Sequence, residues 1–182
     1  RFMRLLEIVE TPTMNKDKMG GLRDFCKNEL GKGIVNCNDT PGFIGNRIGV
    51  YAMQVAMYEA LERGLPVEIA DALFGRPLGI PKTGVFGLYD LIGIDLMKDV
   101  LASFKKELQE DDPFMDVVKP HPLVEKLLEK GFNGNKGPGG FYQTTIVEGD
   151  EHVKAMNTSD MSYYDFDKVD LEIARRVEKE GI

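Results

Sequence analysis

Glu7 is a carboxylate inside an otherwise apolar segment, and such a group can act as an acid, a base or an orienting residue. Residues 3–9 read Met-Arg-Leu-Leu-Glu-Ile-Val, a run typical of a short strand in a sheet that is buried on both faces. A charge there is costly unless it faces a cleft, a cation or a hydrogen-bond donor. Glu7 is therefore a candidate catalytic residue, although a salt bridge at the strand end is the simpler explanation on local grounds.

Asn46 is a carboxamide inside the second apolar segment, residues 43–61. A side-chain amide in such surroundings needs hydrogen-bond partners. Held on a packed helix, it can stabilise charge that develops on a substrate oxygen. The alternative is a buried structural amide whose partners are neighbouring backbone groups, and the residue type leaves both interpretations open.

No cofactor-binding or metal-binding residues are expected in this chain. The segment from Gly79 to Gly84 has the glycine spacing of a phosphate loop, but Val85 stands where the lysine should be. The dinucleotide fingerprint G-x-G-x-x-G is absent. The two cysteines and two histidines have no metal-ligand spacing.

The charge balance disfavours partners that are polyanions. The chain has 182 residues with 23 Lys and Arg against 30 Asp and Glu, a net charge of −7, so nucleic acid and anionic membranes are not expected partners. The low cysteine content suits a cytoplasmic location. Because the chain begins with Arg1 inside an apparent strand, we expect it to be a fragment of a longer protein.

Residues 1–39 have the pattern of the end of a parallel α/β sheet. A strand over 3–9 is followed by a helix that Thr13 can cap and that runs to about Leu30, and then by a strand over 34–37. Two strands do not form a stable sheet by themselves. We therefore expect that the remainder of the sheet lies outside the chain, and that residues 1–38 are loosely held or the chain self-associates.

The remainder of the chain is predicted to be mainly α. Thr40 is a good N-cap and Pro41 fits the first position of a long helix over 43–61. Arg47 argues against a membrane span there. Further helices are predicted over 66–74, 85–91, 95–109 and 122–130. After a glycine-rich turn, residues 144–182 are expected to be a linker with a docking helix through Val169, Ile173 and Val177.

Two motifs resemble the 3-hydroxyacyl-CoA dehydrogenase family. They are residues 3–9, given above, and residues 38–47, Asn-Asp-Thr-Pro-Gly-Phe-Ile-Gly-Asn-Arg. Supporting matches are Gly-Val-Phe-Gly-Leu-Tyr-Asp-Leu-Ile-Gly-Ile-Asp over 84–95 and Gly-Pro-Gly-Gly-Phe-Tyr over 137–142. The resemblance covers about residues 1–143, and the segment 75–82 is more similar to the multifunctional β-oxidation proteins than to the short enzymes.

The resemblance implies a fold and an assignment of domains. Residues 1–39 would be the C-terminal remnant of an NAD-binding Rossmann domain, its last β-α-β piece. Residues 40–143 would be a helical substrate and dimerisation domain of the 6-phosphogluconate-dehydrogenase-like type, and 144–182 the linker and docking helix. The family's glycine fingerprint, serine and histidine would all precede Arg1, so the NAD site would not be in this chain.

The resemblance also implies an activity. The parent enzyme would oxidise 3-hydroxyacyl-CoA to 3-oxoacyl-CoA with NAD in fatty-acid β-oxidation, acting on an acyl-CoA substrate as a homo-oligomer. Glu7 would orient the catalytic histidine, and Asn46 would hydrogen-bond the substrate near the reacting carbonyl. The fragment alone would be inactive. Two alternatives remain open: a related hydroxyacid dehydrogenase that uses no CoA ester, and a helical dimerisation or interaction module in which both residues are structural.

Overall fold

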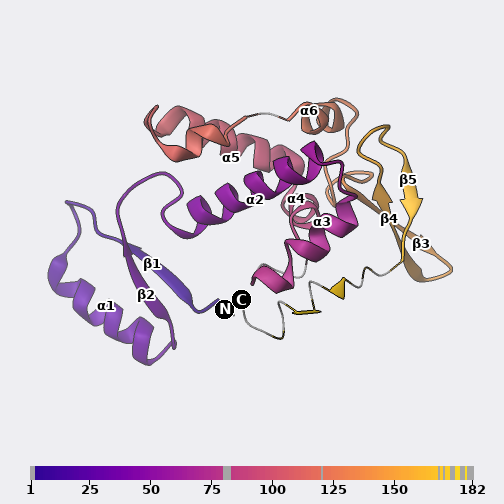
Figure 1. Ribbon diagram of the computed structural model, residues 1–182. Coiled ribbons are helices and arrows are strands. Elements are labelled where there is room, and N and C mark those ends of the chain that lie inside the picture. The colour runs from indigo at the N-terminus through magenta and orange to yellow at the C-terminus, as the bar shows by residue number, and fades with distance from the viewer. Residues whose placement is uncertain are drawn as a thin grey trace. The chain divides into compact units, whose positions relative to one another are not determined.

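The computed structural model describes residues 3–79, 83–119 and 121–167, together with residues 169, 171, 172, 175, 176 and 179. The chain forms two compact units, Arg1–Val50 and Tyr51–Ile182. Figure 1 labels the helices and strands of each unit. The expected mainly α fold with a β-α-β segment at its start is confirmed.

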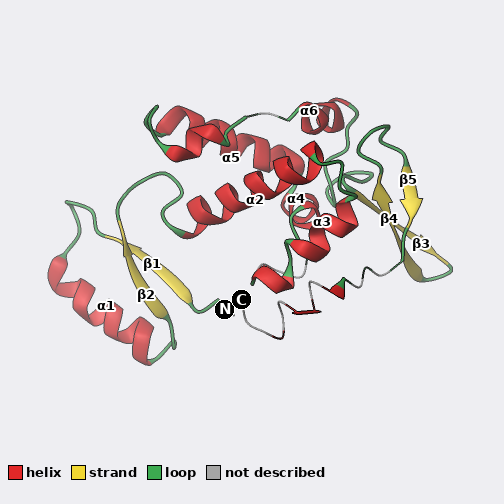
Figure 2. Cartoon of the chain, viewed as in Figure 1, coloured by secondary structure: helices red, strands yellow, loops and turns green. Residues whose placement is uncertain are grey.

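The first unit contains two parallel strands with a helix between them in the chain. Strands β1 (Leu5–Val9) and β2 (Gly33–Cys37) pair directly, and α1 (Lys16–Asn28) connects them (Figure 2). Helix α1 begins after Asn15, which caps it, and not after Thr13 as the sequence predicted. Asn15 is the better cap because its side chain accepts hydrogen bonds from two backbone N–H groups of the first turn.

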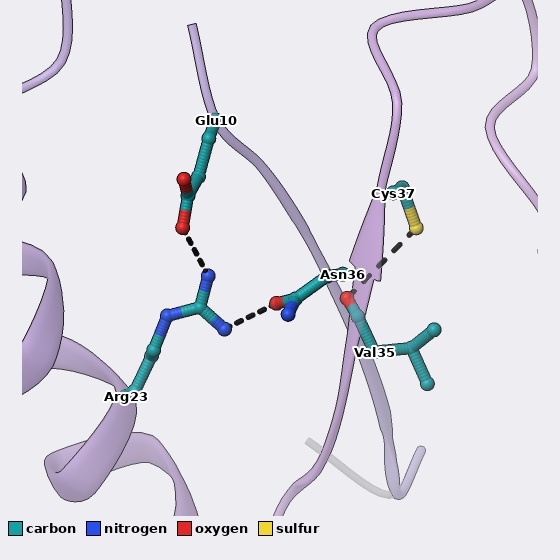
Figure 3. Close-up of polar contacts among 5 residues, drawn as sticks. All are labelled: Glu10, Arg23, Val35, Asn36 and Cys37. Carbon is teal, nitrogen blue, oxygen red and sulfur yellow. Dashed lines mark hydrogen bonds and ion pairs between the residues drawn. The ribbon is translucent and has the colours of Figure 1, made fainter.

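Arg23 ties α1 to both strands of this unit. Its guanidinium donates to the Glu10 carboxylate at 2.6 Å and to the side-chain oxygen of Asn36 (Figure 3). Ile8 from β1 and Cys26 from α1 are buried. A small apolar core and one bridging cation therefore position β1, the strand that carries Glu7.

Helix α2 (Gly45–Glu62) starts later than the sequence predicted. We expected Thr40 to cap it and Pro41 to occupy its first position. Gly42 and Phe43 instead have φ angles of 75° and 51°, so they interrupt a right-handed helix before it can begin. The chain makes a turn over 41–44, and the first helical residue is Gly45.

The second unit is built around the C-terminal half of α2, which buries Met53, Ala56, Met57 and Ala60. The other helices lie within a few residues of their predicted positions. They are α3 (Val67–Leu73), α4 (Phe86–Ile92), α5 (Ile94–Glu107) and α6 (Pro122–Glu129), with short 3₁₀ turns at Arg76–Leu78 and Pro113–Asp116. Among the described residues, no helix is both long and apolar enough to cross a membrane.

The structure differs from the expected linker after residue 143. Strands β3 (Tyr142–Val147), β4 (Asp150–Met156) and β5 (Tyr163–Asp165) form an antiparallel sheet in that order. The turn between β3 and β4 consists of Glu148 and Gly149, both with positive φ, which is the geometry of a tight hairpin. The outer parts of both strands are exposed, so the segment lacks the apolar alternation from which a strand is predicted.

The docking helix predicted after this sheet falls largely outside what the structure describes. Val169 is among the described residues, whereas Ile173 and Val177 lie outside them. The prediction of a docking helix there therefore stays a prediction.

Candidate functional site

Glu7 lies in the middle of β1, directly opposite Val35 of β2, and is half-buried. Its Oε1 accepts hydrogen bonds from the backbone N–H of Ile44 at 3.0 Å and of Gly45 at 2.6 Å. These donors belong to the start of α2, where N–H groups have no partner within the helix. The partial positive charge of a helix N-terminus also favours a carboxylate. The charge inside the strand is thus stabilised by the helix that carries Asn46.

Asn46 follows Gly45 directly and is exposed. The hydrogen bond from Gly45 to Glu7 therefore brings the first turn of α2 to the Glu7 carboxylate within one compact unit. The alternative of a buried amide satisfied by its surroundings is wrong, because the side chain is at the surface. An exposed carboxamide in the first turn of a helix anchored by Glu7 can reach a ligand.

Cys37 is a nucleophilic residue type that lies near enough to Glu7 to feel its charge. Burial raises the pKa of the Cys37 thiol, and the negative charge of Glu7 raises it further. The Cys37 Sγ lies 3.8 Å from the backbone oxygen of Val35 (Figure 3). Since the thiolate is the reactive form, a raised pKa keeps Cys37 neutral and disfavours it as a nucleophile.

The start of α1 does not fit a dinucleotide. A pyrophosphate bound after a parallel strand needs glycines in the turn and unoccupied N–H groups at the helix start. The segment from Glu10 to Asn15 contains no glycine, and the Asn15 side chain accepts from the N–H groups of Asp17 and Lys18 at 3.1 and 3.2 Å. The Asp17 carboxylate adds a negative charge to the first turn. The residues present therefore provide no NAD site here.

Metal ligation finds no support either. Within the described ranges, no group of three or more His, Cys, Asp or Glu side chains could hold a metal ion. Among the residues described, this unit offers a carboxylate fixed by backbone donors, and the helix that supplies one of these donors carries an exposed carboxamide at its next residue.

Two carboxylates in the second unit, Asp90, which is buried, and Asp71, which is half-buried, were not singled out from the sequence. Asp90 in α4 is only 2% exposed and accepts from the N–H groups of Phe141 at 2.9 Å and Tyr142 at 2.7 Å. Burial raises the pKa of Asp90 to about 7. Asp90 interrupts an apolar segment just as Glu7 does, so the same sequence signal could have identified it.

Asp71 in α3 also accepts hydrogen bonds from backbone N–H groups, in this case those at the start of α4. Its carboxylate accepts from the N–H groups of Val85, Phe86 and Gly87, at 2.7, 2.7 and 2.9 Å, and from the Tyr142 hydroxyl at 2.9 Å. Burial raises the pKa of Asp71 to about 6. Because every partner is a structural donor, Asp71 and Asp90 join α3, α4 and β3 rather than forming a second reaction centre.

Comparison with known proteins gives a family for this chain. The family model described as "3-hydroxyacyl-CoA dehydrogenase, C-terminal domain" matches residues 42–144, more than half of the chain. The chain belongs to this family. The resemblance seen in the sequence motifs is thereby confirmed.

One curated relative of this 3-hydroxyacyl-CoA dehydrogenase domain is a putative fatty acid oxidation complex trifunctional enzyme of Rickettsia prowazekii. It is 37% identical over 171 residues, which is 94% of this chain and 24% of the relative. The chain thus spans about a quarter of the length of that protein. Since the alignment leaves few residues out, it extends past residue 144 and includes β4 and β5.

Solved structures of similar proteins share the fold. A 3-hydroxybutyryl-CoA dehydrogenase from Escherichia coli aligns with a TM-score of 0.60 at 30% identity, over 78% of this chain and 29% of that one. FadB2 of M. tuberculosis aligns with a TM-score of 0.64 at 28% identity, over 79% of this chain and 48% of that one. Both alignments cover more of the chain than the family model does.

Proposed function

We propose that this chain is the C-terminal part of an NAD-dependent 3-hydroxyacyl-CoA dehydrogenase that oxidises 3-hydroxyacyl-CoA to 3-oxoacyl-CoA in fatty-acid β-oxidation. The observation that carries the proposal is the bond between Glu7 and the first turn of α2, next to the exposed Asn46. The family membership and the names of the relatives support CoA esters over a CoA-free hydroxyacid. In this proposal, NAD is held by residues outside the chain.

Glu7 acts in this proposal on a histidine supplied by the rest of the parent protein. A carboxylate has two oxygens, and Oε1 is the one that accepts from Ile44 and Gly45. Oε2 would accept the N–H of the imidazole. This contact fixes the tautomer, leaves the second ring nitrogen as the base for the hydroxyl proton, and stabilises the imidazolium that forms.

Asn46 acts on the substrate oxygen. Its carboxamide N–H would donate to the oxygen near the reacting carbon as that oxygen becomes a carbonyl. The start of α2 is held by Glu7, so the backbone that carries Asn46 is fixed before the substrate arrives and the helix need not reorganise. A pre-oriented donor of this kind stabilises the transition state more than the bound substrate.

We also propose that the parent protein is a cytoplasmic homo-oligomer, with no nucleic acid or membrane as partner. An apolar patch on α2 in the second unit supports self-association, because Tyr51 and Val55 are both exposed. These residues are four positions apart and therefore share one side of the helix. An exposed apolar patch of this kind is typical of an interaction surface.

The test is Asn46→Ala in the full-length parent protein, with 3-hydroxybutyryl-CoA as substrate and NADH formation as the measurement. Removal of one such donor lowers kcat by about 10²–10³. Asn28→Ala is the matched control, because Asn28 is an exposed asparagine at the end of α1. An unchanged kcat in Asn46→Ala removes this residue from the site.

The same assay separates the proposed function from its alternatives. Oxidation of free 3-hydroxybutyrate in preference to its CoA ester would indicate the related hydroxyacid dehydrogenase. A full-length parent that oxidises neither compound would leave the helical interaction module as the better description.

A further inference from the structure

The second unit contains an apolar cavity of about 220 Å³ between α2, α5 and the segment that leads into α6. Helix α5 supplies Lys98, Leu101, Ala102 and Lys105, which recur at three- and four-residue spacing and lie on one face. The segment before α6 supplies Val118. The cavity is thus built from regular elements rather than from loops alone.

The floor of the cavity is fixed by a buried polar pair. The Tyr89 hydroxyl donates to Gln54 Oε1, and Gln54 Nε2 donates to the backbone oxygen of Val117 at 3.0 Å. Gln54 and Tyr89 are both almost completely buried. Since these groups satisfy one another, the floor presents mainly apolar surface to a ligand, to which Met57 also contributes.

The rim is cationic, in contrast to the surrounding chain. Lys98, Lys105 and Lys119 line the opening, with His121 and a single carboxylate, Glu125. Among the side chains that the structure describes, no acidic residue forms an ion pair with any of the three lysines. Yet the sequence after Val50 has 15 basic against 24 acidic residues, a net charge of −9. Three unpaired lysines around one cavity are therefore a local reversal of charge.

We propose that this cavity binds a medium-chain fatty-acid anion, with the alkyl chain inside and the carboxylate at the lysines. The apolar walls would bury the tail, which is the main source of affinity. The flexible lysine stems can extend along the apolar rim while their ammonium groups meet the carboxylate. This inference does not depend on the proposed oxidation, because it uses no residue of the Glu7 and Asn46 site.

The test is a titration of the 182-residue chain with octanoate, in which the NMR signal of the Met57 methyl group reports binding. Octanamide has the same tail with a neutral head, so octanoate should bind about fivefold to tenfold more tightly, and added salt should reduce this difference. Across butanoate, hexanoate and octanoate, affinity should rise about threefold to fourfold for each methylene added. Saturable binding with both trends supports the proposal.

Two variants test the parts of the site. Replacement of Lys98, Lys105 and Lys119 by Gln should weaken octanoate about tenfold and leave octanamide unchanged. Lys106→Gln is the matched control, since Lys106 is an exposed neighbour in α5 that does not line the cavity. Ala102→Phe should fill the cavity and weaken both ligands.

Several results would overturn the inference. They are the absence of saturable octanoate binding, equal affinity for octanamide, and an equal effect of Lys106→Gln and the triple variant. If a second copy of the chain occupies the cavity instead, octanoate will not bind and the elution volume will depend on protein concentration. Circular dichroism verifies that each variant is folded. If Ala102→Phe does not fold, the effect of the triple lysine variant on octanoate binding decides between the outcomes.

Discussion

Glu7 has a structural task that is separable from the proposed catalytic one. Its Oε1 is the acceptor for two backbone N–H groups at the start of α2. Loss of a helix-terminal acceptor costs about 0.5–2 kcal/mol in comparable caps. This local bond can be measured in the chain itself, whereas the catalytic role needs the parent protein.

Glu7→Ala should therefore accelerate hydrogen exchange of the Ile44 and Gly45 amides by about tenfold, because their acceptor is lost. Glu7→Gln should have a smaller effect, since its amide oxygen can still accept. The measurement is amide exchange by NMR. Glu10→Ala is the control: it breaks the ion pair with Arg23 but not the bonds to α2. Unchanged exchange in Glu7→Ala would show that the carboxylate does not hold the helix.

Single residues could be recognised from the sequence, but their partners could not. Glu7 and Asp90 both interrupt apolar runs, and this pattern indicates that each carboxylate has a special environment. The donors to Glu7 are 37 and 38 positions away in the chain, and those to Asp90 are 51 and 52 positions away. Such separations are set by tertiary structure, so composition and spacing do not reveal them. The roles of Glu7 and Asn46 in catalysis stay predictions.

At the level of elements, helices were predicted well and their boundaries less so. The apolar periodicity and the Gly and Pro signals placed α3, α4, α5 and α6 within a few residues. The predicted start of α2 was wrong. A Thr-Pro pair indicates a helix start, but Gly42 and Phe43 have positive φ angles and form a turn instead. That turn aims the first N–H groups of α2 at Glu7, a tertiary contact.

The β3–β4 hairpin shows the opposite case, in which a local signal existed. Residues 144–147 read Thr-Thr-Ile-Val, a β-branched run that ends in the turn Glu148-Gly149. β-branched residues before a glycine turn favour a hairpin. The polar composition after residue 142 obscured this signal.

Asp90 joins two elements that are distant in the chain. It lies in α4 and accepts from the backbone at the start of β3. A Cβ on Gly140 would lie 2.0 Å from Asp90 Oδ1, so the chain can approach the carboxylate only with glycine at that position. The glycine-rich segment before β3 is therefore required for packing rather than for phosphate binding.

The stability of this connection should depend on pH. Burial raises the pKa of Asp90 to about 7 and that of Asp71 to about 6 in the folded chain, against about 4 when unfolded. The folded state then binds more protons than the unfolded state between those pH values, so the free energy of unfolding falls as pH rises from 5 to 8, on the order of 4 kcal/mol. Burial lowers the pKa of His121 below its usual value of 6.5. Just below that pH, the unfolded state therefore binds more protons at His121, and this contribution to the free energy of unfolding rises with pH.

Asp90→Asn should flatten this slope, whatever its effect on absolute stability, because Asn does not titrate. Urea unfolding followed by circular dichroism at pH 5 to 8 gives the slope for each protein. Asp99→Asn, an exposed aspartate on α5, should leave it unchanged. Equal slopes for the wild type and Asp90→Asn would show that Asp90 does not titrate in this range.

At the scale of the whole molecule, the two units differ in how completely they bury their apolar residues. In the first unit, the strand residues Leu5 and Val35 and the helix residues Leu22 and Phe25 are all exposed. The second unit buries Phe86 and Phe141, whose ring centroids are 4.7 Å apart. A two-stranded sheet with exposed apolar faces is marginal without further strands. This agrees with a chain that spans about a quarter of its Rickettsia relative.

The division of the proposed enzyme into parts predicts that the 182-residue chain by itself does not bind NADH. A nicotinamide dinucleotide needs a glycine turn and unoccupied N–H groups at a helix start, whereas the Asn15 side chain occupies those of α1. Titration of the chain with NADH should give no saturable change in nucleotide fluorescence, and the full-length parent should give one. A micromolar Kd for the chain alone would mean that its own residues form a cofactor site, and the proposed placement of NAD outside the chain would then be wrong.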